Sequence, residues 1–224
     1  MRDGSEPVHL TAEDDGFTLI EVLVAIAILG VITVPLADVI IDAMTTTVTA
    51  SDQFVLSHDA QISAAFFAQD VAAVGRRDYS GTRTSTGTVP FVASIQEDAA
   101  YDAGGETCGT TVTETTRPAL IRFLSDDWNT TVSPPVVSTD VVAYYLVPAG
   151  AVAELHRMKC VGGASAPVSD VVVAHNVDPG TSVVTCSSPC GAAAVPWRVT
   201  LAFSVTKGSS GPYAITLTGQ RRQS

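Results

Sequence analysis

Residues 16–41 read GFTLIEVLVAIAILGVITVPLADVII, and this stretch decides how the rest of the chain is organised. From Val22 to Ala37 no side chain carries a charge, and only Gly30, Thr33 and Pro35 interrupt the apolar run. Together with its apolar flanks the stretch reaches the ~20 residues that a helix needs to span a bilayer. We therefore expect a membrane-spanning helix here.

Glu21 lies inside this apolar stretch, where an acidic side chain costs about 2–3 kcal/mol on insertion scales. One interpretation is a tolerated charge near the end of an ordinary anchor. The other is a carboxylate that pairs with a cation at the same depth. No Lys or Arg occurs between Arg2 and Arg76. The second interpretation therefore needs a new amino terminus, created by cleavage close to Glu21.

The six residues from Gly16 to Glu21, followed at once by an apolar helix, resemble the prepilin signature of type IV pilins and type II secretion pseudopilins. The resemblance implies that a prepilin peptidase cuts between Gly16 and Phe17 and that the Phe17 amine is then methylated. It also implies that Glu21 is the carboxylate used in filament assembly. The cation missing from the chain is then the Phe17 amine of a neighbouring subunit.

The same resemblance implies the partners and the location of the protein. The partners are other pilins or pseudopilins in a helical filament, the prepilin peptidase, an inner-membrane assembly platform and membrane lipid. The protein would be a single-pass protein of the cytoplasmic membrane with its C-terminal domain outside the cytoplasm. Arg2 and the amino terminus favour a cytoplasmic leader by the positive-inside rule. An ordinary secretory signal has its cleavage site after the apolar region, whereas here the site precedes it.

The helix is expected to continue beyond the membrane, because no proline occurs from Asp38 to Val74 and apolar residues recur at helical spacing. The expected packing stripe consists of Val55, Ile62, Phe66 and Val74, widened by Phe54, Phe67 and Val71. Gly75 offers a stop signal. We expect a helix from Phe17 to Val74, with a kink or local unwinding at Pro35 and a bend or a helix boundary at the β-branched run Thr45–Thr49.

The remainder favours strands, because only 16% of residues are charged and Val, Thr, Ala and Ser abound. Loops are expected at 79–88 and 98–116, around a short strand at 89–95. The other expected strands are 119–124, 141–147, 153–159, 171–176, 182–186, 197–206 and 213–218. Pro148-Ala149-Gly150 predicts a hairpin turn. A long helix packed on an antiparallel sheet is an α+β fold.

This pattern divides the chain into four expected parts. They are a leader at 1–16, a membrane and filament-core helix at 17–41, its amphipathic continuation at 42–75 and a β-rich head domain at 76–224. The strand order in the second half also resembles the J-type minor pseudopilins, with Val141–Leu146, Glu154–Arg157, Val171–Asn176 and Trp197–Val199 as its markers. This resemblance covers about half of the chain and implies a pilin-like fold.

Four cysteines, Cys108, Cys160, Cys186 and Cys190, fall in the expected head domain. An even number in an exported domain permits two disulfides, with three possible connectivities that the sequence leaves open. We favour Cys186 with Cys190 and Cys108 with Cys160. A zinc site is the alternative, although the spacing lacks paired C-x-x-C motifs.

No pattern in the chain predicts an enzyme, a cofactor or a metal site. His58, His156 and His175 lie on an expected helix or strands, where a lone histidine is more often structural than catalytic, and His9 lies in the leader. Acidic residues at Glu97, Asp98, Asp102 and Glu106, and the stretch 126–129, have oxygen ligands for calcium but not the spacing of a known loop. We expect solvated loops there. The net charge of −11 argues against nucleic acid as a partner of the head domain.

Three functions remain. The first is a minor pilin or pseudopilin that joins a filament, and a large cysteine-bearing domain favours an initiating or capping position within it. The second is a membrane-anchored extracytoplasmic binding domain that never polymerises. The third is an exported enzyme that uses the helix as a tether. The Gly16–Glu21 signature favours the first function.

Overall fold

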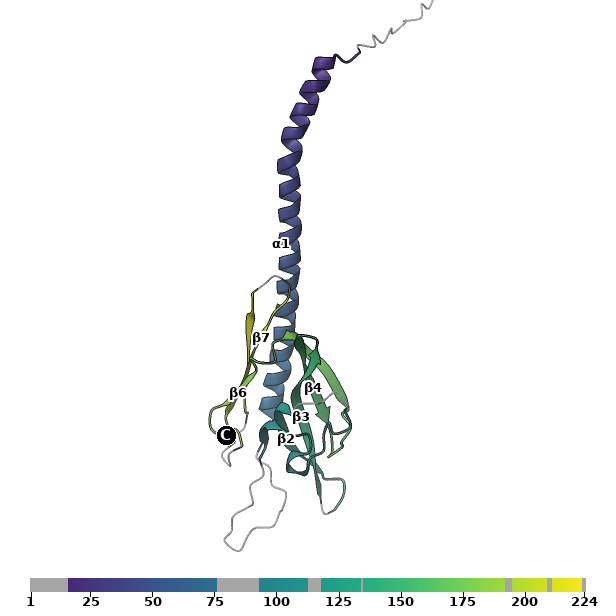
Figure 1. The fold of residues 1–224 in the computed structure, drawn as a ribbon. Coiled ribbons are helices and arrows are strands. Elements are labelled where there is room, and N and C mark those ends of the chain that lie inside the picture. Colours follow the sequence, from purple (N-terminus) through teal and green to yellow (C-terminus); the bar gives the residue numbers. More distant parts are fainter. Residues whose placement is uncertain are drawn as a thin grey trace, which may run out of the picture. The chain divides into compact units, whose positions relative to one another are not determined.

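The computed structural model describes residues 16–75, 93–112, 118–133, 135–191, 195–208 and 211–222. These residues form one long helix, α1 (Leu19–Ala73), a short 3-10 helix and eight β-strands (Figure 1). The chain separates into two compact units, Met1–Val48 and Thr49–Ser224. The architecture is α+β, as the sequence predicts, and is consistent with a pilin-like fold.

Helix α1 is continuous, with Pro35 inside it. It begins two residues later and ends one residue earlier than predicted. No helix boundary falls at Thr45–Thr49, where a bend or a boundary is expected, since these residues are all helical. The hydroxyls of Thr45 and Thr47 donate to the carbonyls of Ile41 and Ala43, one turn earlier, at 3.0 and 2.7 Å. These bonds satisfy the polar groups within the helix, so the weak helix propensity of the run does not interrupt it.

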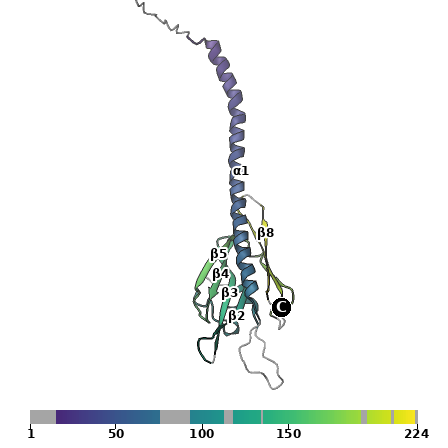
Figure 2. The ribbon, with the colours of Figure 1, turned by 180° about the vertical axis from the view of Figure 1, so that it is seen from behind.

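The eight strands form one antiparallel sheet in the order β1-β2-β3-β4-β5-β7-β6, with β8 paired to β7. Their bounds are β1 Ile95–Ala99, β2 Ala119–Asn129, β3 Val136–Ala149, β4 Val152–Cys160, β5 Ser169–Val177, β6 Val183–Cys186, β7 Arg198–Val205 and β8 Tyr213–Gln220. Seven of them overlap the predicted strands closely. Seen from behind, the C-terminal part of α1 lies in front of the sheet, with β2–β5 to one side and β8 to the other (Figure 2).

Two stretches predicted as loops are strands instead. β1 starts at Ile95, where the predicted strand 89–95 was to end, and most of that predicted strand lies outside the described residues. β2 runs on through residues 126–129, where Asp126 and Asp127 pair with Thr139 and Ser138 of β3. A long neighbouring strand supplies backbone partners in both places, and pairing with it outweighs the low strand propensity of the acidic residues.

The hairpin between β3 and β4 forms where Pro148-Ala149-Gly150 predicted a turn, although Pro148 and Ala149 still belong to β3. Gly150 adopts a φ of +74°, a conformation that residues with a Cβ rarely take. The turn therefore comprises Gly150 and Ala151.

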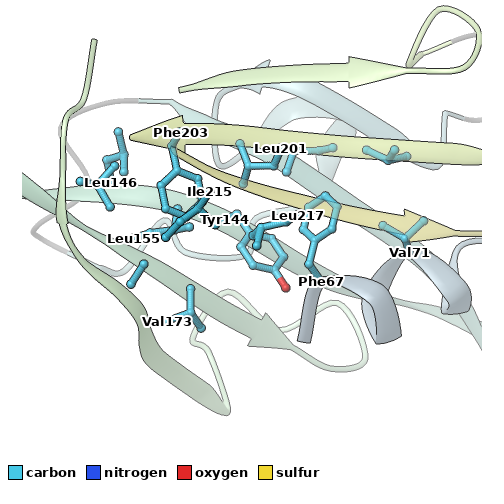
Figure 3. Packing of buried hydrophobic residues seen from close by; sticks show 14 of the residues in the cluster. Phe67, Val71, Tyr144, Leu146, Leu155, Val173, Leu201, Phe203, Ile215 and Leu217 are labelled. Atoms are coloured by element: carbon cyan, nitrogen blue, oxygen red, sulfur yellow. The ribbon is translucent and has the colours of Figure 1, made fainter. Parts of the chain in front are cut away.

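The main core lies between α1 and the sheet (Figure 3). Phe67 of α1 is fully buried and makes edge-to-face contacts with the rings of Phe123 and Tyr144, with centroids 5.6 and 5.4 Å apart. A second, smaller cluster contains Tyr101, Tyr145 and Met158. It lies on the opposite face of the sheet, because successive residues of β3 and β4 point to opposite faces. The sheet is therefore covered on both faces over its central strands.

The predicted packing stripe of α1 is partly wrong. Phe67, Val71 and Val74 are buried as expected, but Phe54 and Val55 are exposed. The buried face of α1 within the second unit consists of Leu56, Asp59, Ser63, Phe67, Asp70 and Val71. Three of its six residues are polar, which is why apolar spacing alone did not identify this face.

Candidate functional site

Thr18 caps the N-terminal end of α1 and lies directly before its first helical residue. The backbone N–H of Glu21 donates to the carbonyl and the side-chain oxygen of Thr18, at 3.1 and 3.4 Å. Thr18 and Glu21 thus have the spacing of a capping box, in which a threonine caps the helix and a glutamate stands three residues later. The same signature that suggests processing therefore also starts the helix.

Phe17 and Glu21 lie along one face at this end of the helix. They line a shallow open groove together with Val22, Ala25, Ile26 and Leu29. Phe17 is 80% exposed and the side chain of Glu21 is exposed as well. The described part of the first unit, residues 16–48, contains no Lys or Arg that could pair with Glu21. The Glu21 carboxylate is therefore exposed among apolar side chains on this face of the helix.

The apolar residues that follow are all available for contact. Every large apolar side chain from Phe17 to Val48 is between 46% and 81% exposed. α1 is long and apolar enough to cross a membrane, by length and composition. Thr33 does not interrupt this surface, because its hydroxyl donates to the carbonyl of Leu29 at 2.8 Å. The segment suits lipid or the apolar helices of partner subunits.

The second half of α1 is held by a set of polar contacts with the sheet, which we call the polar seam: Asp59, Ser63 and Asp70 with their partners. Asp70 accepts two hydrogen bonds from the guanidinium of Arg157, at 2.7 and 2.6 Å, and one from the Tyr144 hydroxyl at 2.6 Å. The Arg157 guanidinium also lies 4.9 Å from the ring centroid of Phe66. The bidentate pair and the hydroxyl satisfy a carboxylate that is otherwise buried.

Burial shapes the acid–base behaviour of this cluster. Removal from water raises the pKa of Tyr144 far above its usual range, and the negative charge of Asp70 adds to the shift. The hydrogen bond to Asp70 raises the pKa of Arg157 as well. The Tyr144 hydroxyl therefore stays protonated and continues to donate to Asp70.

The remaining contacts of the polar seam lie about two and three turns earlier on α1. The Asp59 carboxylate lies 2.9 Å from Nδ1 of His175 and accepts from the backbone N–H of the same residue at 3.1 Å. The Ser63 hydroxyl donates to the carbonyl of Val173 at 2.5 Å. His175 thus links β5 to α1. The sequence patterns do not predict the polar seam. Its only signal in the sequence is that acidic residues occur on the expected helix and basic residues occur on the expected strands.

The other described histidines and acids of the sequence analysis lie at separate places in the fold. His156 lies between Glu154 and Asp170, at 3.4 and 3.3 Å, while His58 is exposed on α1. Glu97 and Asp98 belong to β1, and Asp102 and Glu106 flank the 3-10 helix Ala103–Gly105. Among the described residues no group of three or more metal-binding side chains comes together.

All four cysteines are joined in disulfides. Cys108 is bonded to Cys160 and Cys186 to Cys190, which is the connectivity that we favoured. None of the four retains a free thiol, so the alternative of a zinc site built from them is wrong. The first bridge ties the loop after the 3-10 helix to the end of β4, and the second closes the turn after β6.

A buried arginine fixes the loop that the first bridge also holds. Arg122 of β2 is fully buried and donates to the carbonyls of Ala100, Ala103 and Glu106 and to the side chain of Gln96, at 2.6–3.2 Å. Of the guanidinium nitrogens, Nη1 donates to Gln96 of β1 and to the Ala100 and Ala103 carbonyls, and Nη2 donates to the Glu106 carbonyl. Arg122 therefore holds this loop against β1 and β2.

A comparison with protein families gives one match. Residues 14–37 match the prokaryotic N-terminal methylation motif. Neither the comparison with curated proteins nor the comparison with solved structures gives a match. The matched residues contain Gly16, Phe17 and Glu21 and the apolar half of α1.

The chain thus carries the prepilin-type signature of type IV pilins and pseudopilins. The α+β architecture is consistent with a pilin-like fold, and among the described residues α1 is the one helix long and apolar enough to cross a membrane.

Proposed function

We propose that this protein is a minor pilin or pseudopilin subunit, anchored in the cytoplasmic membrane before it joins a filament. The observation that carries the proposal is the methylation motif, whose Phe17 and Glu21 lie on one exposed face at the start of an apolar helix. The function is structural, and no catalytic group of the described residues argues for an enzyme.

Processing would create the site. Cleavage between Gly16 and Phe17 releases a new amine one helical turn from Glu21, and methylation of that amine would follow. Both charges are costly when they are alone in an apolar surrounding. The Phe17 amine of one subunit and Glu21 of its neighbour stabilise each other when the helices pack in the correct register. The pair therefore favours assembly over isolated subunits.

The position and partners follow from the same proposal. A cytoplasmic leader places the head domain outside the cytoplasm, where both disulfides are expected to persist. The subunit would interact with the prepilin peptidase, the inner-membrane assembly platform, sister pilins and lipid. A large head with two bridges supports an initiating or capping position, and the J-type subtype remains a prediction.

The test compares Glu21→Gln and Glu21→Ala with wild type in membranes that contain the sister pilins. We expect membrane insertion and processing at Phe17 to stay intact, while crosslinks to sister pilins are lost. Asp42→Asn is the matched control, because it removes another exposed acid of α1 from outside the motif. It should leave the crosslinks unchanged.

Processing is tested separately by amino-terminal sequencing after coexpression with a prepilin peptidase. The product should begin at Phe17 with a methylated amine, and Gly16→Ala should slow the cut. An intact Met1, or a cut beyond the apolar segment, would contradict the assignment of the site.

The alternative is an anchored binding domain that never polymerises. It predicts that Glu21→Leu only improves membrane insertion and leaves crosslinking and function as in wild type. Undiminished crosslinks in all Glu21 variants would favour this alternative over filament assembly.

A further inference from the structure

The outer edge of β8 is open to another strand. β8 pairs with β7 without interruption from Tyr213↔Val205 to Gln220↔Arg198, and within the described part of the chain no strand pairs with its other edge. Ile215, Leu217 and Gly219 point into the core, and the alternate residues are exposed. A strand at the edge of a sheet presents unpaired backbone N–H and C=O groups.

The other described edges carry features that prevent pairing with a further strand, but β8 does not. β1 is five residues long and contains two acids, of which Asp98 has a φ of +46°. β6 is only four residues long and ends in a disulfide. The outer edge of β5 is interrupted near Asn176, which has a φ of +57° and adjoins a register shift. β8 reads YAITLTGQ, with no charge, no proline and no bulge.

The region around β8 also differs in charge from the rest of the chain. Between Pro179 and the C-terminus there is no Asp or Glu, whereas Arg198, Lys207, Arg221 and Arg222 all fall there. This part therefore carries a side-chain charge of +4 in a chain whose total is −11. An anionic partner is attracted to this part and repelled by the remainder.

Three of these cations gather at one end of β8 beside an exposed tryptophan. Trp197 is 53% exposed, and the guanidinium of Arg198 lies 4.9 Å from its ring centroid. The N–H of Arg221 donates to the carbonyl of Trp197 at 2.9 Å, and Arg222 follows. No described carboxylate forms an ion pair with Arg198, Arg221 or Arg222, whereas Lys159 and Lys207 are paired with Asp140 and Asp52.

The backbone that carries the tryptophan is held by hydrogen bonds to Ser187. The Ser187 hydroxyl accepts from the backbone N–H groups of Trp197 and Arg198, at 3.0 and 3.2 Å. The N–H of Ser187 in turn donates to the carbonyl of Arg198 at 2.9 Å. Tryptophan and arginine are the side chains that most often dominate the binding energy of protein interfaces.

From the unpaired outer edge of β8 and the cluster of cations beside Trp197 we propose that β8 binds an extended segment of an acidic partner protein as an additional antiparallel strand. The backbone of that segment pairs with the open edge of β8. Its acidic residues lie beside Gln220 and meet Arg198, Arg221 and Arg222, while Trp197 packs against its side chains. Arginine forks match carboxylate geometry, so charge complementarity fixes the orientation of the segment.

The antiparallel direction follows from the sheet, in which every pairing is antiparallel. The acidic residues therefore occupy the N-terminal end of the docked segment, next to the C-terminal end of β8. The proposal concerns the head domain alone and does not depend on processing at Gly16 or on Glu21.

The test uses the full chain in detergent and a fluorescent peptide of three aspartates followed by alternating threonine and valine. We expect saturable binding by fluorescence anisotropy. In a Trp128→Phe background, which leaves Trp197 as the only tryptophan, the emission should shift on binding. A peptide with three lysines in place of the aspartates should bind at least about tenfold more weakly.

Backbone pairing is tested by N-methylation of the peptide. A strand docked on one edge uses every second N–H, because the others point away from it. Methylation of one alternate set should abolish binding, while methylation of the other set should leave it unchanged. Equal affinity of both methylated peptides would overturn the strand pairing.

The charge contact is tested by a matched pair of substitutions. Arg222→Gln should weaken binding by about five- to tenfold, as expected for the loss of one charge-assisted contact. Lys207→Gln removes the same charge between β7 and β8, at the far end of β8, and should have no effect on binding. Equal effects of the two substitutions would overturn the proposed location of the acidic residues.

Other occupants give different results. A dimer of the free protein that the peptide dissociates would show that β8 pairs with a second copy. Displacement of the peptide by a single-stranded oligothymidine at lower concentration would show a nucleic-acid surface. Either result, or a lack of binding by the aspartate peptide, would overturn the proposal. The Glu21→Gln variant should bind the peptide as wild type does, which separates this test from that of filament assembly.

Discussion

The two halves of α1 have similar helical geometry but opposite surroundings. From Leu19 to Val48 the large side chains are apolar and exposed, and the described contacts of the polar groups are within the helix. From Thr49 to Ala73 the buried face is half polar, and each polar residue on it has a partner in the sheet. The surface of the first half is therefore suited to contact with lipid or with other apolar helices. The second half packs specifically on its own sheet.

The difference shows that hydrophobicity does not report burial in this protein. The more apolar half of α1 is the exposed one. The buried half relies on hydrogen bonds and an ion pair that are satisfied only in one arrangement, and such contacts specify a unique packing.

The largest effect is expected from Asp70→Ala. The substitution leaves the Arg157 guanidinium buried without a counter-charge, which should lower the free energy of unfolding of the head domain by roughly 3–5 kcal/mol. Urea unfolding followed by near-UV circular dichroism measures the change. Asp42→Ala, in the exposed half of α1, should stay within about 0.5 kcal/mol of wild type. Equal losses at both positions would abolish the contrast between the halves.

Two leucines offer a matched comparison of the halves. Leu56 is 4% exposed and Leu36 is 54% exposed. Leu56→Ala should destabilise the head domain by about 3 kcal/mol, because it removes buried apolar contacts and leaves a cavity. Leu36→Ala should leave the unfolding midpoint of the head domain unchanged in the same urea titration. A large loss from Leu36→Ala would mean that the first half also supports the head.

A smaller effect is expected where α1 approaches β8 most closely. A Cβ at Gly219 would overlap the side chain of Val71, so the sheet accepts the helix here only because this residue is glycine. Gly219→Ala should cost about 1–3 kcal/mol through overpacking. Val71→Ala, introduced into the Gly219→Ala variant, should recover part of that loss in a double-mutant cycle. Strictly additive losses would contradict the close approach.

The smallest expected effect is on the stability of the head domain at alkaline pH, through Tyr144 of the polar seam. The raised pKa of Tyr144 keeps it protonated in the folded head, whereas in the unfolded chain it ionises near its ordinary value of about 10. The stabilisation is therefore complete below pH ~10 and falls by about 1.4 kcal/mol per pH unit above it. Tyr144→Phe should reduce this slope between pH 10 and 11 in thermal unfolding, and an unchanged slope would contradict the assignment.

Most elements could be predicted from the sequence because their signals are local. The apolar run predicts α1, and the alternation around Val199, Leu201 and Phe203 predicts β7. The candidate site at Gly16–Glu21 is equally local, since the cap, the groove and the motif match all fall within a few residues.

The remaining features depend on residues far apart in the chain. Asp59 and Asp70 look like solvent-facing positions until His175 and Arg157, 116 and 87 residues later, are brought beside them. β1 contains two acids and becomes a strand because it pairs with β2, where Arg122 also binds Gln96. Single-residue propensities do not contain such long-range partners.

The polar seam also has a mechanical consequence. A shift of α1 by one residue would move its side chains about 1.5 Å along the axis. Such a shift would separate Asp70 from Arg157, Asp59 from His175 and Ser63 from the Val173 carbonyl together. A pull along the helix is therefore borne by three contacts at once. The polar seam therefore resists sliding of α1 along the sheet under such a pull.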